Sequence, residues 1–120
     1  MQKKPAQGLT RILNATKYSY QGIRAAVLGE AAFREELIAC IVLIPVALFS
    51  DVTRIERLLL ISSLLLVLIV ELLNSAIEAV VDRIGLEHHQ LAGQAKDMGS
   101  AAVLIAILIS LYIWIDIFAF

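Results

Sequence analysis

The chain has 120 residues, a net charge of -1 and 60% hydrophobic residues, with a mean hydropathy of +0.85. A soluble domain is typically about 45–50% apolar, and a chain this short has too little interior to bury the excess. These values exclude an ordinary soluble domain and predict side chains that face lipid. The small net charge gives no information about binding partners. The single cysteine, Cys40, excludes an internal disulfide and a cluster of thiol metal ligands.

The N-terminal part of the chain is predicted to form a helix on the membrane surface. Residues 1–10 are polar and lack the apolar core of a signal peptide, so we expect no segment to be cleaved. Over residues 7–28, apolar side chains recur at helical spacing between basic and polar ones, with Tyr18 and Tyr20 among them. This pattern is typical of an interfacial helix. A helix packed on a partner domain is the alternative, although this chain contains no such domain.

Three further segments are candidate transmembrane helices, each of which needs roughly 20 residues to cross the hydrocarbon core. The first, about 30–49, has an apolar part of only 13 residues. It can cross if its charged start reaches the interface, where long side chains extend their charged ends, and if neighbouring helices tolerate a kink at Pro45. The second segment is about 57–81. The third, about 99–119, is the clearest, with Asp116 as its one charged residue.

The distribution of Lys and Arg predicts the orientation. Eight of these residues lie on the side of the N-terminus and of the connection 82–97, whereas only Arg54 and Arg57 lie near the connection 50–56. Because basic residues are retained on the cytoplasmic side of bacterial membranes, we expect the N-terminus and the connection 82–97 in the cytoplasm.

The second half of the middle segment carries polar side chains at helical spacing. Ionisable groups at bilayer depth are costly and usually mark function. Polar residues that only join helices are the alternative, but several on one face favour a functional site. The stripe, which descends from bilayer depth to the interface, consists of Glu71, Asn74, Ser75, Glu78 and Asp82.

Charged residues from the other two spans are expected at the same cytoplasmic level. Two carboxylates that meet repel each other unless a cation joins them, and such ligands suit Mg2+, which shares phosphate oxygens. A lysine at a helix start suits a phosphate, and a carboxylate one turn deeper can accept a proton from an alcohol. This combination predicts a cytoplasmic nucleotide placed against a hydroxyl in the membrane, although spacing alone does not distinguish a kinase from a proton relay. The residues are Glu30, Arg34, Lys96 and Asp97.

No Gly-rich phosphate loop of either common kind is present in the sequence, so a nucleotide site here belongs to neither large kinase class. Three stretches nevertheless carry a family resemblance: EAAFR at 30–34, ELLNSAIEAVVDRIG at 71–85 and AKDMGSAA at 95–102. They are similar to the prokaryotic diacylglycerol kinases, the small integral-membrane type, and the resemblance extends from about Gly8 to the third span.

The resemblance implies an all-α integral membrane protein with an N-terminal amphipathic surface helix and three transmembrane helices, assembled as a homotrimeric bundle. It implies a multi-pass protein of the bacterial inner (cytoplasmic) membrane, with no nucleic-acid partner. It also implies that Mg2+ supports transfer of the γ-phosphate of ATP to diacylglycerol, a membrane lipid, giving phosphatidic acid and ADP.

Residue roles are implied by position in the same family. Glu71 resembles the general base, Asn74 lies in the catalytic stripe, and Glu30 and Glu78 resemble the metal-binding carboxylates. The residues that fall where the family holds nucleotide are Arg11, Tyr18, Glu30, Glu78, Glu87, His89, Lys96 and Asp97. Those that fall near the lipid substrate are Ser19, Arg34, Glu36, Glu71 and Ser100.

The sequence departs from the family at His88, where a tyrosine is expected, and at Gln94, where an arginine is expected. The resemblance therefore does not decide which nucleotide contacts the connection 82–97 makes. His88 and His89 lack the spacing of a metal pair and are interpreted as solvated loop residues. An undecaprenol kinase is the runner-up, because it also phosphorylates a membrane-level hydroxyl. A small proton-coupled exporter subunit that uses Glu71, or a non-catalytic assembly subunit, represents a different class.

Overall fold

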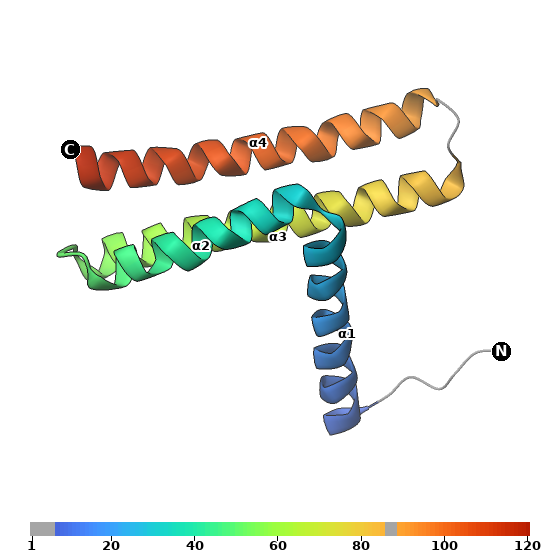
Figure 1. Cartoon of the computed structure of the whole chain (residues 1–120), viewed down its shortest axis with the longest axis horizontal. Helices are drawn as coiled ribbons and strands as arrows, with labels where there is room; N and C mark the ends of the chain where they lie inside the picture. Colours follow the sequence, from blue (N-terminus) through green and yellow to red (C-terminus); the bar gives the residue numbers. More distant parts are fainter. Residues whose placement is uncertain (1–6, 86–88) are drawn as a thin grey trace.

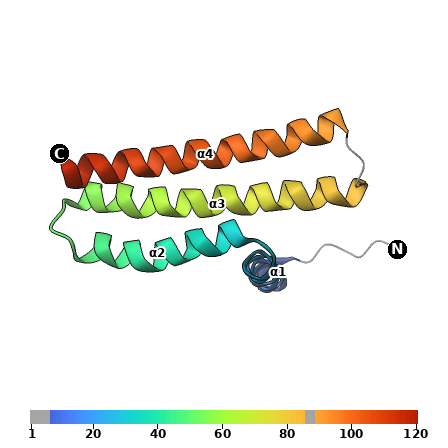
Figure 2. The same ribbon diagram turned by 45° about the horizontal axis from the view of Figure 1, so that its top comes forward.

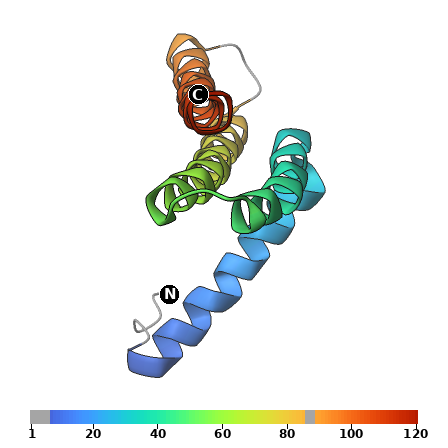
Figure 3. The same cartoon turned by 90° about the vertical axis from the view of Figure 1, so that its left-hand side faces the viewer.

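The computed structural model describes residues 7–85 and 89–120, which form four α-helices (Figure 1). Of these, α2, α3 and α4 run side by side, with each antiparallel to the next and α3 in the middle (Figure 2). The remaining helix, α1, projects crosswise from the start of α2 (Figure 3). The predicted all-helical class is confirmed. The bounds are α1 (Gly8–Gly29), α2 (Ala31–Phe49), α3 (Arg54–Ile84) and α4 (Gln90–Ala119).

Two of the helices, α3 and α4, are long and apolar enough to cross a membrane. At 1.5 Å per residue, helices of 31 and 30 residues are about 45 Å long, against about 30 Å of hydrocarbon, so both extend beyond it. The 19 residues of α2 offer no comparable 18-residue window, because every such window contains Arg34, Glu35 and Glu36. Its helix continues through Pro45. A crossing by α2 stays a prediction.

The start of α3 is set by a reciprocal capping box. The Oγ1 of Thr53 accepts a hydrogen bond from the backbone N–H of Glu56 at 3.1 Å, and Oε1 of Glu56 accepts one from the N–H of Thr53 at 2.9 Å. Two N–H groups that have no partner within the helix are satisfied in this way. As a result α3 begins at Arg54, ahead of the apolar residues that predicted a span from about 57.

The connection between α3 and α4 is shorter than the predicted connection 82–97, because most of those residues are helical. The Nδ1 of His89 caps α4 by accepting a hydrogen bond from the N–H of Leu91 at 3.1 Å, so the helix begins at Gln90 rather than near residue 99. Hydropathy detects only the part of a helix that suits lipid. Capping and backbone hydrogen bonds extend α4 into the polar region.

Buried polar groups join α3 to α4. The hydroxyls of Ser63 and Ser110 are hydrogen-bonded at 3.1 Å, and the indole Nε1 of Trp114 donates to the carbonyl of Leu60 at 3.2 Å. Leu60 and Val67 are the largest fully buried side chains of the described residues. Since lipid is as apolar as a leucine side chain, close packing and such hydrogen bonds, rather than hydrophobic exclusion, hold membrane helices together.

Arg57 joins the C-terminal end of α2 to the first turn of α3. Its Nε donates to the carbonyl of Ala47 at 3.1 Å, and its Nη2 reaches the carbonyls of Ser50 at 3.2 Å and Val52 at 3.4 Å. The last carbonyls of a helix lack partners within the helix, and a cation there also interacts favourably with the helix dipole. One side chain therefore stabilises the whole turn between two helices.

We expect Arg57→Leu to lower the free energy of unfolding by about 1–3 kcal/mol, because carbonyls that now accept from a charged donor lose their partner. Reversible unfolding in mixed detergent micelles measures this change. Arg54→Leu is the matched control, since Arg54 is exposed in the same first turn, and its effect should stay within about 0.5 kcal/mol. Equal losses for the two variants would contradict the capping role.

Candidate active site

The candidate site lies where the second half of α3 passes between the α1–α2 corner and the first half of α4 (Figures 1 and 2). The corner forms because the backbone of Glu30 is extended, with φ -124° and ψ 109°, so that one helix ends and the next begins at this residue. Arg34 stabilises the corner by donating from Nη1 to the carbonyls of Val27 at 2.8 Å and Leu28 at 3.3 Å. The corner therefore holds Glu30 beside the second half of α3, where it lines a pocket together with Ser75.

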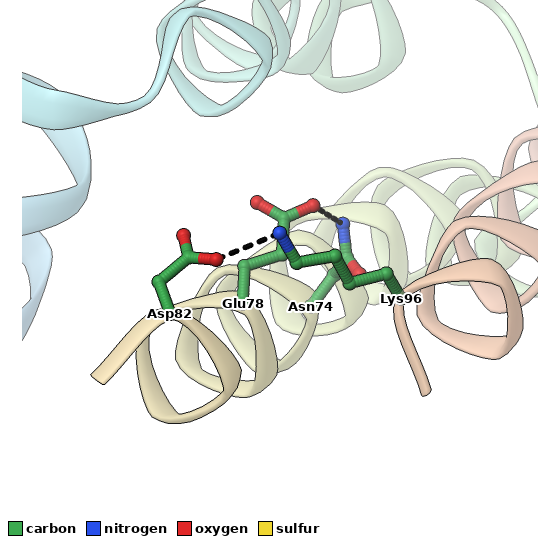
Figure 4. Close-up of polar contacts among 4 residues, drawn as sticks. All are labelled: Asn74, Glu78, Asp82 and Lys96. Atoms are coloured by element: carbon green, nitrogen blue, oxygen red, sulfur yellow. Dashed lines mark hydrogen bonds and ion pairs between the residues drawn. The ribbon is translucent and has the colours of Figure 1, made fainter. Parts of the chain in front are cut away.

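The predicted polar stripe lies on one continuous helix, α3. Its deepest member, Glu71, is buried, with only 7% of its surface exposed. One turn further on, the Nδ2 of Asn74 donates to Oε1 of Glu78 at 3.3 Å (Figure 4). Asn74 thereby restrains the orientation of the Glu78 carboxylate.

Several carboxylates gather around Glu71. Those of Glu78, Glu30 and Glu35 lie close enough to interact electrostatically with it, as does that of Glu36. They come from α3, from the α1–α2 corner and from α2, so residues far apart in the sequence share one electrostatic environment. Such a cluster of like charges is typical of a cation or proton site.

Lys96 extends the polar region onto α4. Its Nζ lies 2.7 Å from Oδ1 of Asp82, in an ion pair whose side chains are 44% and 55% exposed (Figure 4). Lys96 lies in the polar first turns of α4, before the apolar stretch. The hydrogen bond and the charge of Asp82 raise its pKa above the usual value, so it stays cationic at neutral pH. Because exposed ion pairs contribute only about 0–1 kcal/mol, an arriving phosphate can compete for this lysine.

A pocket of about 620 Å³ opens between α1 and α3. Its polar lining residues are Ser19, Glu30 and Ser75, and the rest of its wall is apolar or glycine, with Gly22 and Ala26 on α1 and Ala76 on α3 among them. A pocket with a few polar side chains in an otherwise apolar wall suits the head of a lipid.

The predicted metal ligands are Glu30 and Glu78. The Glu30 side chain makes no capping bond to α2, so its carboxylate is available. Within residues 7–85 and 89–120, no group of three or more His, Cys, Asp or Glu forms a dedicated cage. Mg2+ usually takes one or two carboxylates together with waters and phosphate oxygens. Glu30 and Glu78 each interact electrostatically with Glu71, and two carboxylates without a third ligand suit a Mg2+ that arrives with a nucleotide better than a resident metal.

Not all of the predicted nucleotide residues come together within one chain. Arg11 lies near the start of α1, the end that projects away from the other helices (Figure 3), and Tyr18 is exposed further along the same helix. His89 caps α4, and Asp97 is exposed beside Lys96. Glu87, with His88, lies outside the described residues.

The predicted lipid residues have separate surroundings. Ser19 lines the pocket, with its hydroxyl donating to the carbonyl of Ala15 at 2.8 Å, while Arg34 caps α1. Glu36 is partly buried on α2, near Glu71, and Ser100 is exposed on α4. The structure therefore brings Ser19 to the pocket and Glu36 to the carboxylate cluster, and leaves Ser100 on an outer surface.

Sequence reasoning did not identify two contributors to this site. Gly99 is buried against Asn74, and the small residues Ala95 and Gly99, four apart, are the signal that could have indicated close packing there. The carboxylate of Glu35 belongs to the electrostatic cluster. Glu35 lies on α2, which packs against α3, and no spacing within α2 predicts which of its side chains this packing brings near Glu71.

Comparison with known proteins identifies the class of protein. The model of the prokaryotic diacylglycerol kinase family matches residues 17–118. A diacylglycerol kinase of Escherichia coli strain K12 is 60% identical over 107 residues, which cover 89% of this chain and 88% of that protein. One of Pseudomonas aeruginosa is 57% identical over 114 residues, covering 95% and 93% of the two chains. One of Haemophilus influenzae is 54% identical over 107 residues, covering 89% and 91%.

The chain belongs to the prokaryotic diacylglycerol kinase family. It is an enzyme of the kinase class and a membrane protein, as its sequence predicts.

Proposed function

We propose that the chain transfers the γ-phosphate of ATP to the free hydroxyl of diacylglycerol, giving phosphatidic acid and ADP, at the cytoplasmic face of the bacterial inner membrane. The observation that carries the proposal is the buried carboxylate of Glu71 among carboxylates from three parts of the chain. Ser75, one turn away, and Glu30 line a pocket open to a lipid head. The similar proteins described above are diacylglycerol kinases, which supports diacylglycerol as the substrate.

Glu71 is the proposed general base. The hydroxyl oxygen of diacylglycerol attacks the γ-phosphorus, its proton passes to the Glu71 carboxylate, and the bond from the γ-phosphorus to the bridging oxygen breaks, releasing ADP. The burial of Glu71 at the end of the apolar part of α3 supports this role, because a lipid hydroxyl reaches that depth while bulk water is largely excluded. Asn74 acts beside it by directing Glu78.

Glu30 and Glu78 are the proposed ligands of Mg2+, which neutralises charge on the phosphates when it is bound. The proposed nucleotide residues on α4 and its cap are His89, Lys96 and Asp97. α4 begins at Gln90, so Lys96 lies nearly two turns inside the helix rather than at its start, and it is the charge of this partly exposed lysine that favours phosphate. Glu87 is proposed as a further nucleotide residue on the family resemblance alone.

The lipid is proposed to enter the pocket between α1 and α3. Ser19 lies in its wall, and Arg34 and Glu36 lie on the adjoining first turns of α2. Ser100, exposed on α4, is proposed as a lipid residue because the family resemblance implies it. A pocket bordered by a surface helix admits the head of a lipid sideways, while its chains stay among the membrane lipids.

We propose that the protein works as a homotrimer with three spans per chain. Arg11 and Tyr18 are exposed on α1, the helix that projects away from the rest of its own chain (Figure 3), and we propose that a neighbouring chain completes their surroundings. Many large apolar side chains on all four helices are exposed, as expected for contact with lipid or with other chains. The distribution of Lys and Arg supports a cytoplasmic N-terminus.

The substrate is tested with purified protein in one detergent, with lipid alcohols expressed as mole fraction in the micelle. We expect kcat/KM for a short-chain diacylglycerol to exceed that for undecaprenol by at least about tenfold, because a site for two anchored chains discriminates against a single flexible one. A preference for the polyprenol would overturn the assigned substrate and favour an undecaprenol kinase. If the protein consumes ATP neither with diacylglycerol nor with undecaprenol, the kinase proposal fails and the exporter or assembly alternatives are favoured.

Glu71→Gln keeps the size of the side chain but cannot accept the proton, so we expect kcat to fall by at least about 10²-fold. The assembled protein should stay intact by size-exclusion chromatography. Asp116→Asn, near the opposite end of the bundle, is the matched control and should retain activity. Near-normal kcat for Glu71→Gln would remove this residue from the mechanism.

Glu30→Gln and Glu78→Gln should each abolish most activity and raise the Mg2+ concentration for half-maximal rate. Because the two carboxylates would share one cation, the double variant should be little worse than either single one. Asp51→Asn, in the connection between α2 and α3, provides a control for removing a carboxylate elsewhere. Independent, multiplicative losses would argue against a shared metal.

A further inference from the structure

At Gly99 the missing side chain leaves room for the side chain of Asn74. Gly99 is buried in α4. A Cβ built on it would overlap Oδ1 of Asn74 and would lie 3.2 Å from Cγ and 3.8 Å from Cβ of the same residue. Real atoms cannot overlap in this way, so any larger residue at this position must displace the Asn74 amide.

The backbone gives no other reason for glycine here. Among the described residues, a left-handed φ that favours glycine occurs only at Gly8. For the other glycines within helices, Gly22, Gly29 and Gly93, no atom of the part of the chain that the structure describes lies within 4 Å of a built Cβ. Glycine is less favourable than alanine inside a helix, so the benefit of Gly99 lies in the space it leaves. All three nearest atoms belong to the Asn74 side chain, and this points to that amide rather than to general helix packing.

The orientation of the amide gives that space a chemical meaning. The Nδ2 of Asn74 donates to Oε1 of Glu78 at 3.3 Å, which leaves Oδ1 turned toward α4. Oδ1 is buried, and no group within residues 7–85 and 89–120 is hydrogen-bonded to it. Rotating the amide by half a turn would place its oxygen against the carboxylate, where two acceptors repel. Gly99 therefore accommodates the side of the amide opposite the hydrogen bond.

We propose that Gly99 is a positioning residue: the space it leaves on α4 holds the Asn74 amide in the plane that lets Nδ2 restrain the Glu78 carboxylate. This inference rests on the proposed function, in which Glu78 is a Mg2+ ligand. Partners that orient a metal ligand typically affect metal affinity or activity by about 10–100-fold. Gly99 touches no substrate and acts only through Asn74.

The first test is activity of the full chain in detergent. Gly99→Ala should raise the Mg2+ concentration for half-maximal rate, or lower kcat/KM for MgATP, by about 10–100-fold, with the KM for diacylglycerol unchanged. Gly93→Ala is the matched control on the same helix, because its Cβ would meet open space, and it should behave as wild type. Wild-type Mg2+ dependence in Gly99→Ala, or an equal rise in the KM for diacylglycerol, would overturn the proposal.

The second test is a double-mutant cycle. In Asn74→Ala the nearest remaining atom would be a Cβ at the ordinary distance of 3.8 Å, so adding Gly99→Ala should then cost no further activity and no stability. An additional loss in the double variant would show that Gly99 acts through something other than Asn74. This comparison holds even if Gly99→Ala alone fails to fold.

The third test does not depend on turnover. The chain has two asparagines, Asn14 on α1 and Asn74, so ¹⁵N labelling of asparagine side chains gives two amide signals by NMR. Gly99→Ala should shift the Asn74 signal and leave that of Asn14 in place, and Gly93→Ala should shift neither. An unmoved Asn74 signal would overturn the contact. Failure of the wild type to phosphorylate diacylglycerol would instead overturn the proposed function.

Discussion

A carboxylate enters the hydrocarbon core of a membrane only at a large cost in free energy, unless polar partners, water or a proton accompany it. In this chain Glu71 follows thirteen residues of α3, 58–70, that are apolar except for two serines, and it is buried by other helices rather than exposed. Because Glu71 directly follows these apolar residues, the polar half of α3 begins at this carboxylate. The other polar contacts of the site lie further along the same helix, toward Asp82.

The α1–α2 corner sets the approach of further carboxylates to Glu71. Glu30 lies at the corner itself and Glu35 lies in the first turns of α2, and both interact electrostatically with Glu71. One extended residue and the guanidinium of Arg34 on the last carbonyls of α1 create the corner. Beyond this contact α1 projects away from the bundle (Figure 3). A single arginine thus connects the direction of α1 to the geometry of the carboxylate cluster.

On the other side of α3, α4 contributes a cation and a space. Lys96 pairs with Asp82 at the outer end of the stripe, while Gly99 leaves room for the amide of Asn74 one turn deeper. At the far end of the same helix pair, Ser63 with Ser110 and Trp114 with Leu60 hold the two helices together. Polar contacts at both ends therefore fix how far α4 can slide along α3. In the proposed mechanism, that register decides whether Asn74 and Lys96 are in place.

The sequence by itself determined the helical class, the apolar stretches of α3 and α4, and the polar stripe from Glu71 to Asp82, because a helix brings residues three and four apart onto one face whatever surrounds it. Its motifs also determined the family. Helix ends were less predictable: hydropathy identified the part of α4 suited to lipid, but the cap at His89 begins the helix earlier. The approach of Glu30 and Glu35 to Glu71, the capping contacts of Arg34 and Arg57, and the place of Gly99 against Asn74 were decided by tertiary structure alone. These contacts depend on how separate helices cross and how far they are shifted along one another, and no spacing within a single helix specifies either.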